Sequence, residues 1–278
     1  MGYKTILTVI STEGQQGQLD AAIDMARRED AHLDVFCLGV DHSQTGYYYA
    51  GASAYVFQES IDKAMAAAES LEAAARARLA REDIRWSVES AVAQVGGLTT
   101  LIGMRARFSD LVLLTRPYGD DAPPDGEAVT EAALFEGRAP VLISPNRGLP
   151  ADFGKKVMIA WNQTEEAMTA VRRAMPFLVA AESVEITVVD PSPHGPERSD
   201  PGGALCQMLT RHGVNASIAV LARTMPTTSE ILNHRAIEIG ADLIVMGAYS
   251  HSRFREAILG GTTRSMLGKT GLPILMAR

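Results

Sequence analysis

Short apolar runs alternate along this chain with longer segments whose apolar residues recur every three or four positions. The short runs indicate buried β-strands, and the longer segments indicate amphipathic helices. We expect strands at 4–10, 33–40, 86–92, 111–114 and 140–144, and again at 156–160, 184–189, 217–221, 243–246 and 273–277. We expect helices at 18–30, 59–82, 98–106 and 127–135, and again at 165–181, 203–212 and 228–239. Buried strands that alternate with helices are typical of a parallel sheet covered on both faces.

The two halves of this pattern are copies of each other. Residues 4–12 parallel 156–164, residues 109–114 parallel 241–246, and residues 139–144 parallel 272–277, all in the same order. Ordered matches of this kind indicate a tandem repeat. The predicted fold class is therefore α/β, with two tandem doubly wound parallel-sheet domains at 1–146 and 154–278 and a boundary containing proline and glycine.

A ligand is expected at one edge of such a sheet, because doubly wound sheets bind ligands beyond the carboxyl ends of their strands. In the second repeat this edge brings together Asn162, Asp190 and Gly247, which follow three different strands. The same repeat carries Gly260-Gly261 directly before Thr262-Thr263 and a helix-compatible segment. Unpaired N–H groups at a helix N-terminus, beside glycines that allow close approach, form a favourable site for a phosphate.

Composition narrows the function classes. The net charge of −7 argues against non-specific nucleic-acid binding, which needs a basic surface. Cys37 and Cys206 lie far apart and outside any C-x-x-C pair, so we interpret them as buried thiols in a reducing compartment rather than metal ligands. We find no targeting segment and no apolar stretch of membrane-spanning length, so we expect a soluble cytoplasmic protein.

Catalytic motifs of related folds are missing from the sequence. There is no G-x-x-x-x-G-K-[ST] loop, no G-x-G-x-x-G after the first strand of either half and no G-x-S-x-G elbow. His251 has no nucleophile or carboxylate at a recognisable spacing, which favours a positioning or exposed side chain over a general base. Asp110 and Asp242 begin equivalent strands, which favours a structural hydrogen bond over catalysis. The segment 47–49 is three tyrosines, interpreted as a loop packed on the protein rather than a stacking platform for a ligand.

The end of the second repeat resembles the motif of nucleotide-binding universal stress proteins, G-x2-G-x9-G followed by Ser or Thr. The matching frame here is Gly247, Ser250, Gly260 and Gly261, with two residues between the first two positions and nine before the third. Ser250 replaces the second glycine, and Gly261 stands where the hydroxyl residue is expected, with Thr262 just behind it. Together with the repeat, this frame is similar to the tandem-domain members of the family, with the adenine nucleotide alpha hydrolase-like fold.

The resemblance implies roles for individual residues. Asn162 matches the acidic residue that contacts the adenine or ribose, and backbone groups around Val188 and Val189 would read the edge of the base. The phosphates would be held by Gly247, Ser250, Gly260, Gly261 and Thr262, with Arg253 and Arg255 as supplementary charge. The implied ligand is ATP or AMP, with Mg²⁺ accompanying ATP. The resemblance also suggests that the repeats pack as a pseudo-dimer through 140–144 and 273–277, and it leaves homodimers of the chain open.

The first repeat lacks this frame. Thr115 stands at the position of Gly247, and the segment after it adds Asp120, Asp121 and Asp125, which would repel a triphosphate. We therefore expect the nucleotide site of the N-terminal repeat to be degenerate.

The sequence favours a cytoplasmic stress-response protein that binds an adenine nucleotide in its C-terminal repeat and switches association with partners. It designates no catalytic residue, and slow ATP hydrolysis stays open. Two alternatives also stay open: a scaffold or interaction module with drifted sites and no nucleotide, and a small-ligand or ATP-hydrolysing enzyme centred on His251.

Overall fold

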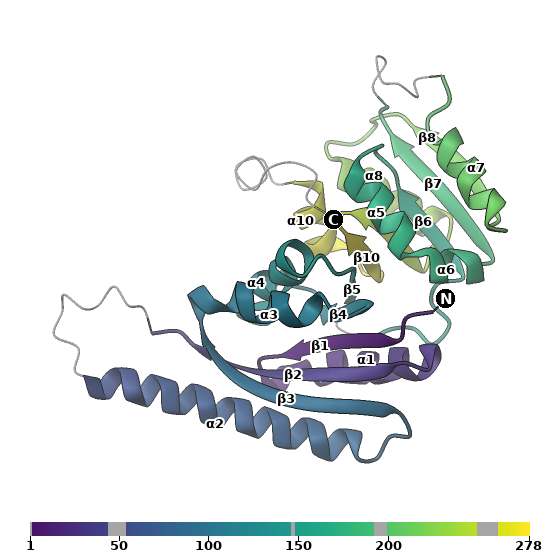
Figure 1. The fold of residues 1–278 in the computed structure, drawn as a ribbon. Helices are drawn as coiled ribbons and strands as arrows, with labels where there is room; N and C mark the ends of the chain where they lie inside the picture. Colours follow the sequence, from purple (N-terminus) through teal and green to yellow (C-terminus); the bar gives the residue numbers. More distant parts are fainter. Residues whose placement is uncertain (1, 44–53, 146–147, 192–198, 249–260) are drawn as a thin grey trace. The chain divides into compact units, whose positions relative to one another are not determined.

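The computed structural model describes residues 2–43, 54–145, 148–191, 199–248 and 261–278 (Figure 1). The chain forms two compact units. The N-terminal unit is Tyr3–Pro117 with Asp121–Ala139, and the C-terminal unit is chiefly Pro140–Arg278 with Tyr118–Asp120. None of the helices in the described ranges is both long and apolar enough to cross a membrane.

The N-terminal unit is built on a parallel sheet with the strand order β3-β2-β1-β4. Its strands are β1 (Thr5–Ile10), β2 (His32–Asp41), β3 (Arg85–Gln94) and β4 (Leu111–Thr115). Its helices are α1 (Gln16–Glu29), α2 (Ala54–Leu79), α3 (Leu98–Ala106) and α4 (Gly126–Glu131), with 3-10 turns at Glu13–Gln15 and Val95–Gly97 and a π-helical turn at Ala132–Glu136. Helix α2 runs along β2 and β3, as Figure 1 shows.

The C-terminal unit is built on a sheet with the strand order β5-β10-β9-β6-β7-β8. Its strands are β5 (Val141–Ser144), β6 (Lys156–Ala160), β7 (Ser183–Val189), β8 (Ala216–Leu221), β9 (Leu243–Gly247) and β10 (Ile274–Ala277). Its helices are α5 (Glu165–Arg173), α6 (Met175–Ala180), α7 (Gly203–Arg211), α8 (Thr228–Glu238) and α10 (Thr262–Lys269). Neighbouring strands from β10 to β8 run parallel.

The last strands of the two sequence repeats pair with each other inside the C-terminal unit. β5 and β10 run antiparallel, with Leu142 opposite Leu275. These are the two apolar terminal strands that the resemblance paired. The compact units divide before β5, whereas the sequence repeats divide after it, so the domain limits 1–146 and 154–278 and the pseudo-dimer stay predictions.

One predicted helix is wrong in its extent. The segment 165–181 is two helices, α5 and α6, separated at Ala174, whose φ of −84° and ψ of −2° end the regular α-geometry. Pro176 lies in the first turn of α6, where its missing N–H costs nothing. Inside one continuous helix the same ring would clash with the carbonyl of Arg172, four residues earlier, so the chain starts a new helix instead.

The two cysteines differ in their surroundings. Cys37 is fully buried on β2, and burial, with a smaller contribution from the Glu72 carboxylate, raises the pKa of its thiol to about 12. Cys206 is only half-buried on α7, with its Sγ 3.6 Å from the carbonyl oxygen of Ala216. The interpretation of both as buried thiols is therefore confirmed for Cys37 and wrong for Cys206.

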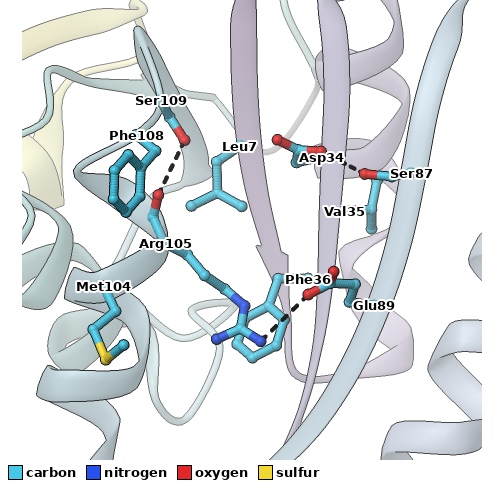
Figure 2. A pocket seen from close by; sticks show the side chains of 10 residues that line it. All are labelled: Leu7, Asp34, Val35, Phe36, Ser87, Glu89, Met104, Arg105, Phe108 and Ser109. Atoms are coloured by element: carbon cyan, nitrogen blue, oxygen red, sulfur yellow. Dashed lines mark hydrogen bonds and ion pairs between the residues drawn. The ribbon is translucent and has the colours of Figure 1, made fainter.

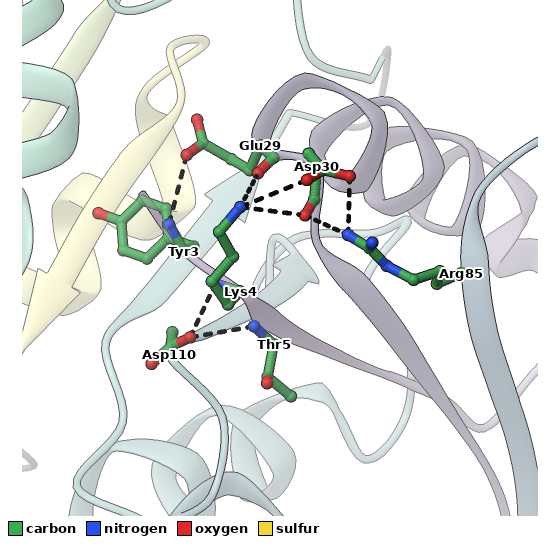
Figure 3. A network of polar contacts seen from close by, with 7 residues as sticks. All are labelled: Tyr3, Lys4, Thr5, Glu29, Asp30, Arg85 and Asp110. Carbon is green, nitrogen blue, oxygen red and sulfur yellow. Dashed lines mark hydrogen bonds and ion pairs between the residues drawn. The ribbon is translucent and has the colours of Figure 1, made fainter. Parts of the chain in front are cut away.

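An aspartate anchors the start of the first strand in each repeat. The Asp242 carboxylate accepts hydrogen bonds from the backbone N–H groups of Gly154 (2.8 Å), Lys155 (3.1 Å) and Lys156 (3.1 Å). In the N-terminal unit, the Asp110 carboxylate accepts hydrogen bonds from the N–H groups of residues 4 and 5 at 2.8 and 3.0 Å (Figure 3). The structural role predicted for both aspartates is confirmed.

The same corner of the N-terminal unit closes the end of α1. Asp30 is the C-cap of this helix, with a left-handed φ of 49°. The Lys4 ammonium group donates to the carbonyl oxygens of Glu29 and Asp30 at 3.3 Å each, and the Arg85 guanidinium donates to the Asp30 carbonyl at 2.5 Å (Figure 3). Cations at a helix C-terminus satisfy its last carbonyl groups and complement the helix dipole.

We expect Asp242→Ala to lower the free energy of unfolding of the C-terminal unit by about 2 kcal/mol, because three backbone N–H groups lose a charged acceptor. Urea unfolding followed by circular dichroism measures the change. Asp83→Ala, at an exposed position in the turn before β3, is the control and should change the free energy by less than about 0.5 kcal/mol. Equal stability of Asp242→Ala and the unmodified chain would contradict the anchoring role.

Candidate functional site

The candidate site lies at the carboxyl edge of the C-terminal sheet, where neighbouring strands end. The order β9-β6-β7 places three strands side by side, and the register aligns Ala160, the last residue of β6, with Thr187 of β7. Asn162 follows β6, Val188–Val189 close β7, and Gly247 closes β9. The topology therefore brings these predicted positions to one edge of one sheet.

The side chains of Asn162 and Thr164 hold the turn after β6. The amide oxygen of Asn162 accepts a hydrogen bond of 2.9 Å from the Thr164 hydroxyl. Thr164 is the N-cap of α5, and its Oγ1 accepts a hydrogen bond of 3.2 Å from the N–H of Ala167. Between them, Gln163 adopts a left-handed φ of 64°. The exposed Asn162 thus shapes the start of α5 with its oxygen, and no described residue bonds its amide NH2 group.

Gly247 lets the first turn of α5 approach the end of β9. A β-carbon at this position would lie 2.6 Å from the backbone nitrogen of Ala167 and 2.9 Å from the carbonyl carbon of Glu166. Backbone atoms cannot move aside as the end of a flexible side chain can, so any side chain at position 247 would push α5 away. Packing therefore requires this glycine, and the packing brings the N-terminus of α5 next to the edge where the ligand is predicted.

The described part of the glycine-rich segment is the start of α10. Gly261 is the N-cap, and its carbonyl oxygen accepts a hydrogen bond of 3.1 Å from the N–H of Ser265, so the helix begins at Thr262. Arg264, which no motif singled out, lies in this first turn with its guanidinium carbon 4.8 Å from the centroid of the Tyr118 ring. The N–H groups at a helix start point outward, and together with the helix dipole and this guanidinium they give the turn positive potential.

Several predicted positions lie outside the described residues. They are Ser250, Arg253 and Gly260 of the implied site, together with Arg255, His251 and the three tyrosines 47–49. The roles assigned to them stay predictions.

A buried donor without a partner marks the same edge. Trp161 directly follows β6 and is 6% exposed, and its backbone N–H donates to the carbonyl of Thr187 at 2.9 Å. No acceptor for its indole Nε1–H is present among the described residues. A buried polar group left without a partner costs roughly 1–3 kcal/mol, and native proteins keep few of them. A hydrogen-bond acceptor on a ligand at this edge would remove that cost.

Strand β7 extends past the end of β6 at this edge. Val188 and Val189 pair with β8 on one side, opposite Val220 and Leu221. On the other side, the pairing with β6 ends at Thr187. Backbone groups of alternate strand residues point to opposite sides, and the Asp190 N–H donates to Leu221 on the β8 side, so it is Val189 whose groups face the β6 side beyond the paired part of the sheet. The resemblance places contacts to the base around this position.

In the N-terminal unit, two buried glutamines fill the equivalent edge. The amide oxygen of Gln15 accepts hydrogen bonds from the backbone N–H groups of Ser11 (2.8 Å) and Thr12 (3.0 Å) after β1. The amide oxygen of Gln18 accepts a hydrogen bond of 2.8 Å from the N–H of Thr115, at the end of β4. A bond of 3.0 Å from Gln15 Nε2 to Gln18 Oε1 joins the two side chains.

The glutamines leave no room for a nucleotide in that repeat. Gln18 Nε2 also donates to the carbonyl of Val9 at 2.7 Å and to the Thr8 hydroxyl at 2.9 Å. The cavity that remains beside Gln15 and Gln18 has a volume of about 10 Å³, about enough for one water molecule. The protein itself thus satisfies the backbone groups at these strand ends, which supports the expectation that this site is degenerate.

The acidic residues after β4 were expected to repel a triphosphate, and this expectation is wrong for Asp125. Asp120 and Asp121 are exposed, as a repulsive acidic segment requires, but Asp125 is buried as the N-cap of α4. Its burial raises the pKa of its carboxyl group, against the opposing effect of His42, whose Nε2 lies 3.7 Å away. The filled cavity supports a degenerate site in this repeat more directly than surface charge does.

The sequence held a signal for the two glutamines that was missed. Continuing the match between 4–12 and 156–164 by a few residues places Gln15 opposite Ala167 and Gln18 opposite Ala170. All four positions are buried, near the start of the first helix of each repeat. Glutamines at these positions indicate an edge filled by side chains, and alanines indicate an open one.

Comparisons with known proteins agree with this architecture. Residues 154–278 match the model of the universal stress protein family. Over 37 residues the chain is 49% identical to universal stress protein Slr1230 of Synechocystis sp., a match that spans 13% of either protein.

Two solved structures share the fold over nearly the whole chain. A universal stress protein from Archaeoglobus fulgidus DSM 4304 has a TM-score of 0.70 at 16% identity, covering 99% of this chain and 96% of that one. A functionally unknown protein from Pseudomonas aeruginosa PAO1 has a TM-score of 0.62 at 16% identity, covering 99% and 92%. The predicted fold of two α/β repeats is confirmed.

We expect Gly247→Ala to destabilise the C-terminal unit by about 2–3 kcal/mol, because the new methyl group overlaps the backbone of α5. The measurement is urea unfolding of the purified variant. Gly271→Ala is the matched control, since a β-carbon at that exposed position meets no atom within 4 Å. A loss of stability equal in both variants would contradict the close approach of α5 to β9.

Proposed function

Residues 154–278 belong to the universal stress protein family, and from this premise we propose that the C-terminal repeat binds an adenine nucleotide, ATP or AMP. The observation that carries the proposal is the unpaired indole N–H of the buried Trp161, at the edge where Asn162 and Gly247 lie. It is a buried donor with no acceptor among the described residues, and an acceptor atom of a ligand would satisfy it.

The chemistry of this edge suits the parts of such a ligand. Trp161 and Asn162 offer N–H donors, which fit the acceptor nitrogens of adenine and the ribose oxygens. Backbone groups around Val188 and Val189, of which those of Val189 face the β6 side beyond the pairing with β6, would read the edge of the base. The first turn of α10, after Gly261, suits an anionic phosphate.

We assign Mg²⁺ to the nucleotide rather than to the protein. The described residues contain no group of three or more His, Cys, Asp or Glu side chains that could hold a metal ion. The ion would therefore enter with ATP, held by phosphate oxygens and water.

The proposed role is a switch rather than a turnover enzyme. Binding would bias association with partner proteins in a cytoplasmic stress response. ATP hydrolysis uses water as the nucleophile and needs groups that orient it and stabilise the transferred phosphoryl group, and we assign no such role to the described residues of the edge. Slow ATP hydrolysis stays open, and an enzyme centred on His251 would involve a residue outside the described part.

A nucleotide-free scaffold is the second candidate function. The filled edge of the N-terminal unit favours it, because Gln15 and Gln18 bond the backbone N–H groups at the strand ends from within the protein. The C-terminal repeat has alanines at both matching positions, which separates it from that case.

Tryptophan fluorescence tests the nucleotide proposal directly. The chain has 2 tryptophans, so Trp86→Phe leaves Trp161 as the only reporter. In protein first shown to be nucleotide-free, we expect ATP or AMP to change the Trp161 emission with saturation at one nucleotide per chain. GTP serves as the control for the base and should bind at least about tenfold more weakly.

Asn162→Ala tests whether the Asn162 side chain contributes to nucleotide binding. We expect it to weaken ATP binding by about tenfold, the equivalent of one lost hydrogen bond. Asn215→Ala is the control, because Asn215 lies at the opposite end of the sheet, before β8. No change in emission and no heat of binding with ATP or AMP would refute the proposal and leave the scaffold.

A further inference from the structure

We propose that the N-terminal unit carries a docking site for a segment of a partner protein that presents a basic side chain beside apolar ones. The site is a cavity of about 250 Å³ between α3 and the strands β1, β2 and β3 (Figure 2). It does not depend on the nucleotide proposed for the other repeat.

The cavity is separate from the edge that the glutamines fill. Its strand residues include Leu7 of β1, Asp34 of β2 and Ser87 of β3, and all of them lie in the amino-terminal halves of their strands. Gln15 and Gln18 contact the carboxyl ends of β1 and β4 instead. The two features therefore lie toward opposite ends of the same sheet.

The floor of the cavity already holds a guanidinium group on an aromatic ring. The Arg105 guanidinium carbon lies 4.0 Å from the centroid of the buried Phe36 ring. Its Nη2 is 3.4 Å from Glu89 Oε2, and Figure 2 shows the side chain running from α3 across Phe36 toward Glu89. This contact shows that the cavity suits planar cations, which are attracted to the face of an aromatic ring.

The strand wall is acidic. The register of β2 and β3 places Asp34 opposite Ser87 and Phe36 opposite Glu89, so these four side chains share one face of the sheet. The Asp34 carboxylate accepts a hydrogen bond from the Ser87 hydroxyl. The lining holds two carboxylates, of Asp34 and Glu89, and one guanidinium, of Arg105, and His32 Nε2 lies 3.3 Å from Asp34 Oδ1. A cation is therefore attracted to this cavity and an anion is repelled.

The helix wall is apolar and exposed. Met104 is 55% exposed and Phe108 is 81% exposed, and both line the cavity from α3 and the turn after it. In Figure 2 their side chains lie on the side of the cavity away from β3. Exposed aromatic and methionine side chains are typical of protein-binding surfaces, and Met adapts readily to different partners.

Size and composition together select the occupant. A volume of about 250 Å³ is below the roughly 300–1,000 Å³ of most small-molecule pockets, and it suits one long side chain. The apolar rim of Met104 and Phe108 extends the contact beyond the cavity, as neighbouring residues of a peptide would need. The geometry therefore points to a lysine or arginine flanked by apolar residues, with its charge near Asp34 and Glu89.

Nuclear magnetic resonance with methyl-labelled methionine tests the site. The probe is acetyl-Ala-Leu-Arg-Leu-Ala-amide, titrated into the full chain to about 5 mM, and the Met104 signal is assigned with Met104→Leu. We expect the Met104 methyl signal to shift with a Kd of about 1 mM or tighter, as fits a small peptide contact. Met65, exposed on α2, is the internal control and should not shift.

Variants of the cavity test whether its acidic and apolar side chains both contribute to peptide binding. Glu89→Lys and Phe108→Ser should each weaken the arginine peptide by about fivefold or more. Asp83→Lys and Ile237→Ser, at exposed positions elsewhere, are the matched controls and should leave the Kd unchanged. Because Phe108 and Glu89 are exposed, we expect the other methionine signals to show an unchanged fold in both variants.

Three outcomes would overturn the proposal. They are an unmoved Met104 signal, an equal shift with the peptide that carries glutamate in place of arginine, and binding of arginine amide alone as tightly as the peptide. The last result would assign the cavity to a small organic cation.

Discussion

The site of each repeat depends on how closely its first helix approaches the end of its fourth strand. In the C-terminal unit, Gly247 and the backbone of Ala167 are so close that a β-carbon would lie 2.6 Å from the helix nitrogen. In the N-terminal unit, Thr115 takes the place of the glycine. The backbone N–H of Thr115 donates a hydrogen bond to the side-chain oxygen of Gln18, which links the helix to the strand. The first helix meets the fourth strand through backbone packing in the C-terminal unit and through glutamine side chains in the N-terminal unit.

The two solutions satisfy the backbone in different ways. Gln15 and Gln18 bond the N–H groups of Ser11, Thr12 and Thr115, so the strand ends of the N-terminal unit need no outside partner. The C-terminal edge has alanines at the matching positions and keeps the Trp161 indole N–H without a described acceptor. Buried polar groups that lack a partner are rare because they cost free energy. The described backbone groups of the N-terminal edge are therefore satisfied from within the protein, and the unpaired donor of the C-terminal edge supports the proposed nucleotide site.

Local patterns were enough to predict the elements and several anchors. The apolar runs located the strands, because a parallel sheet buries both faces of each strand. The repeated aspartates Asp110 and Asp242 were correctly interpreted, since a carboxylate at a strand start readily accepts backbone N–H groups. The break at Ala174 was missed although Pro176 signalled it, because the amphipathic pattern of 165–181 continues across the proline.

Features that join distant parts of the chain could not be predicted in this way. The bond from Thr115 to Gln18 crosses 97 residues, and the stacking of Arg105 on Phe36 depends on where α3 crosses the sheet. Arg264 of the candidate site was missed because the motif drew attention to arginines in the preceding loop. Side-chain pairing of this kind follows from register and helix placement, which periodicity does not specify.

Hydrogen exchange measured by mass spectrometry, on nucleotide-free chain with and without ATP, tests the central claim most directly. The account predicts that ATP slows exchange in the turn after β6, at residues 161–167, and at the start of α10, at residues 261–266. It predicts no change at residues 11–18 and 113–117, where glutamines fill the edge. Protection at the N-terminal edge, or no protection at either edge with saturating ATP, would contradict it.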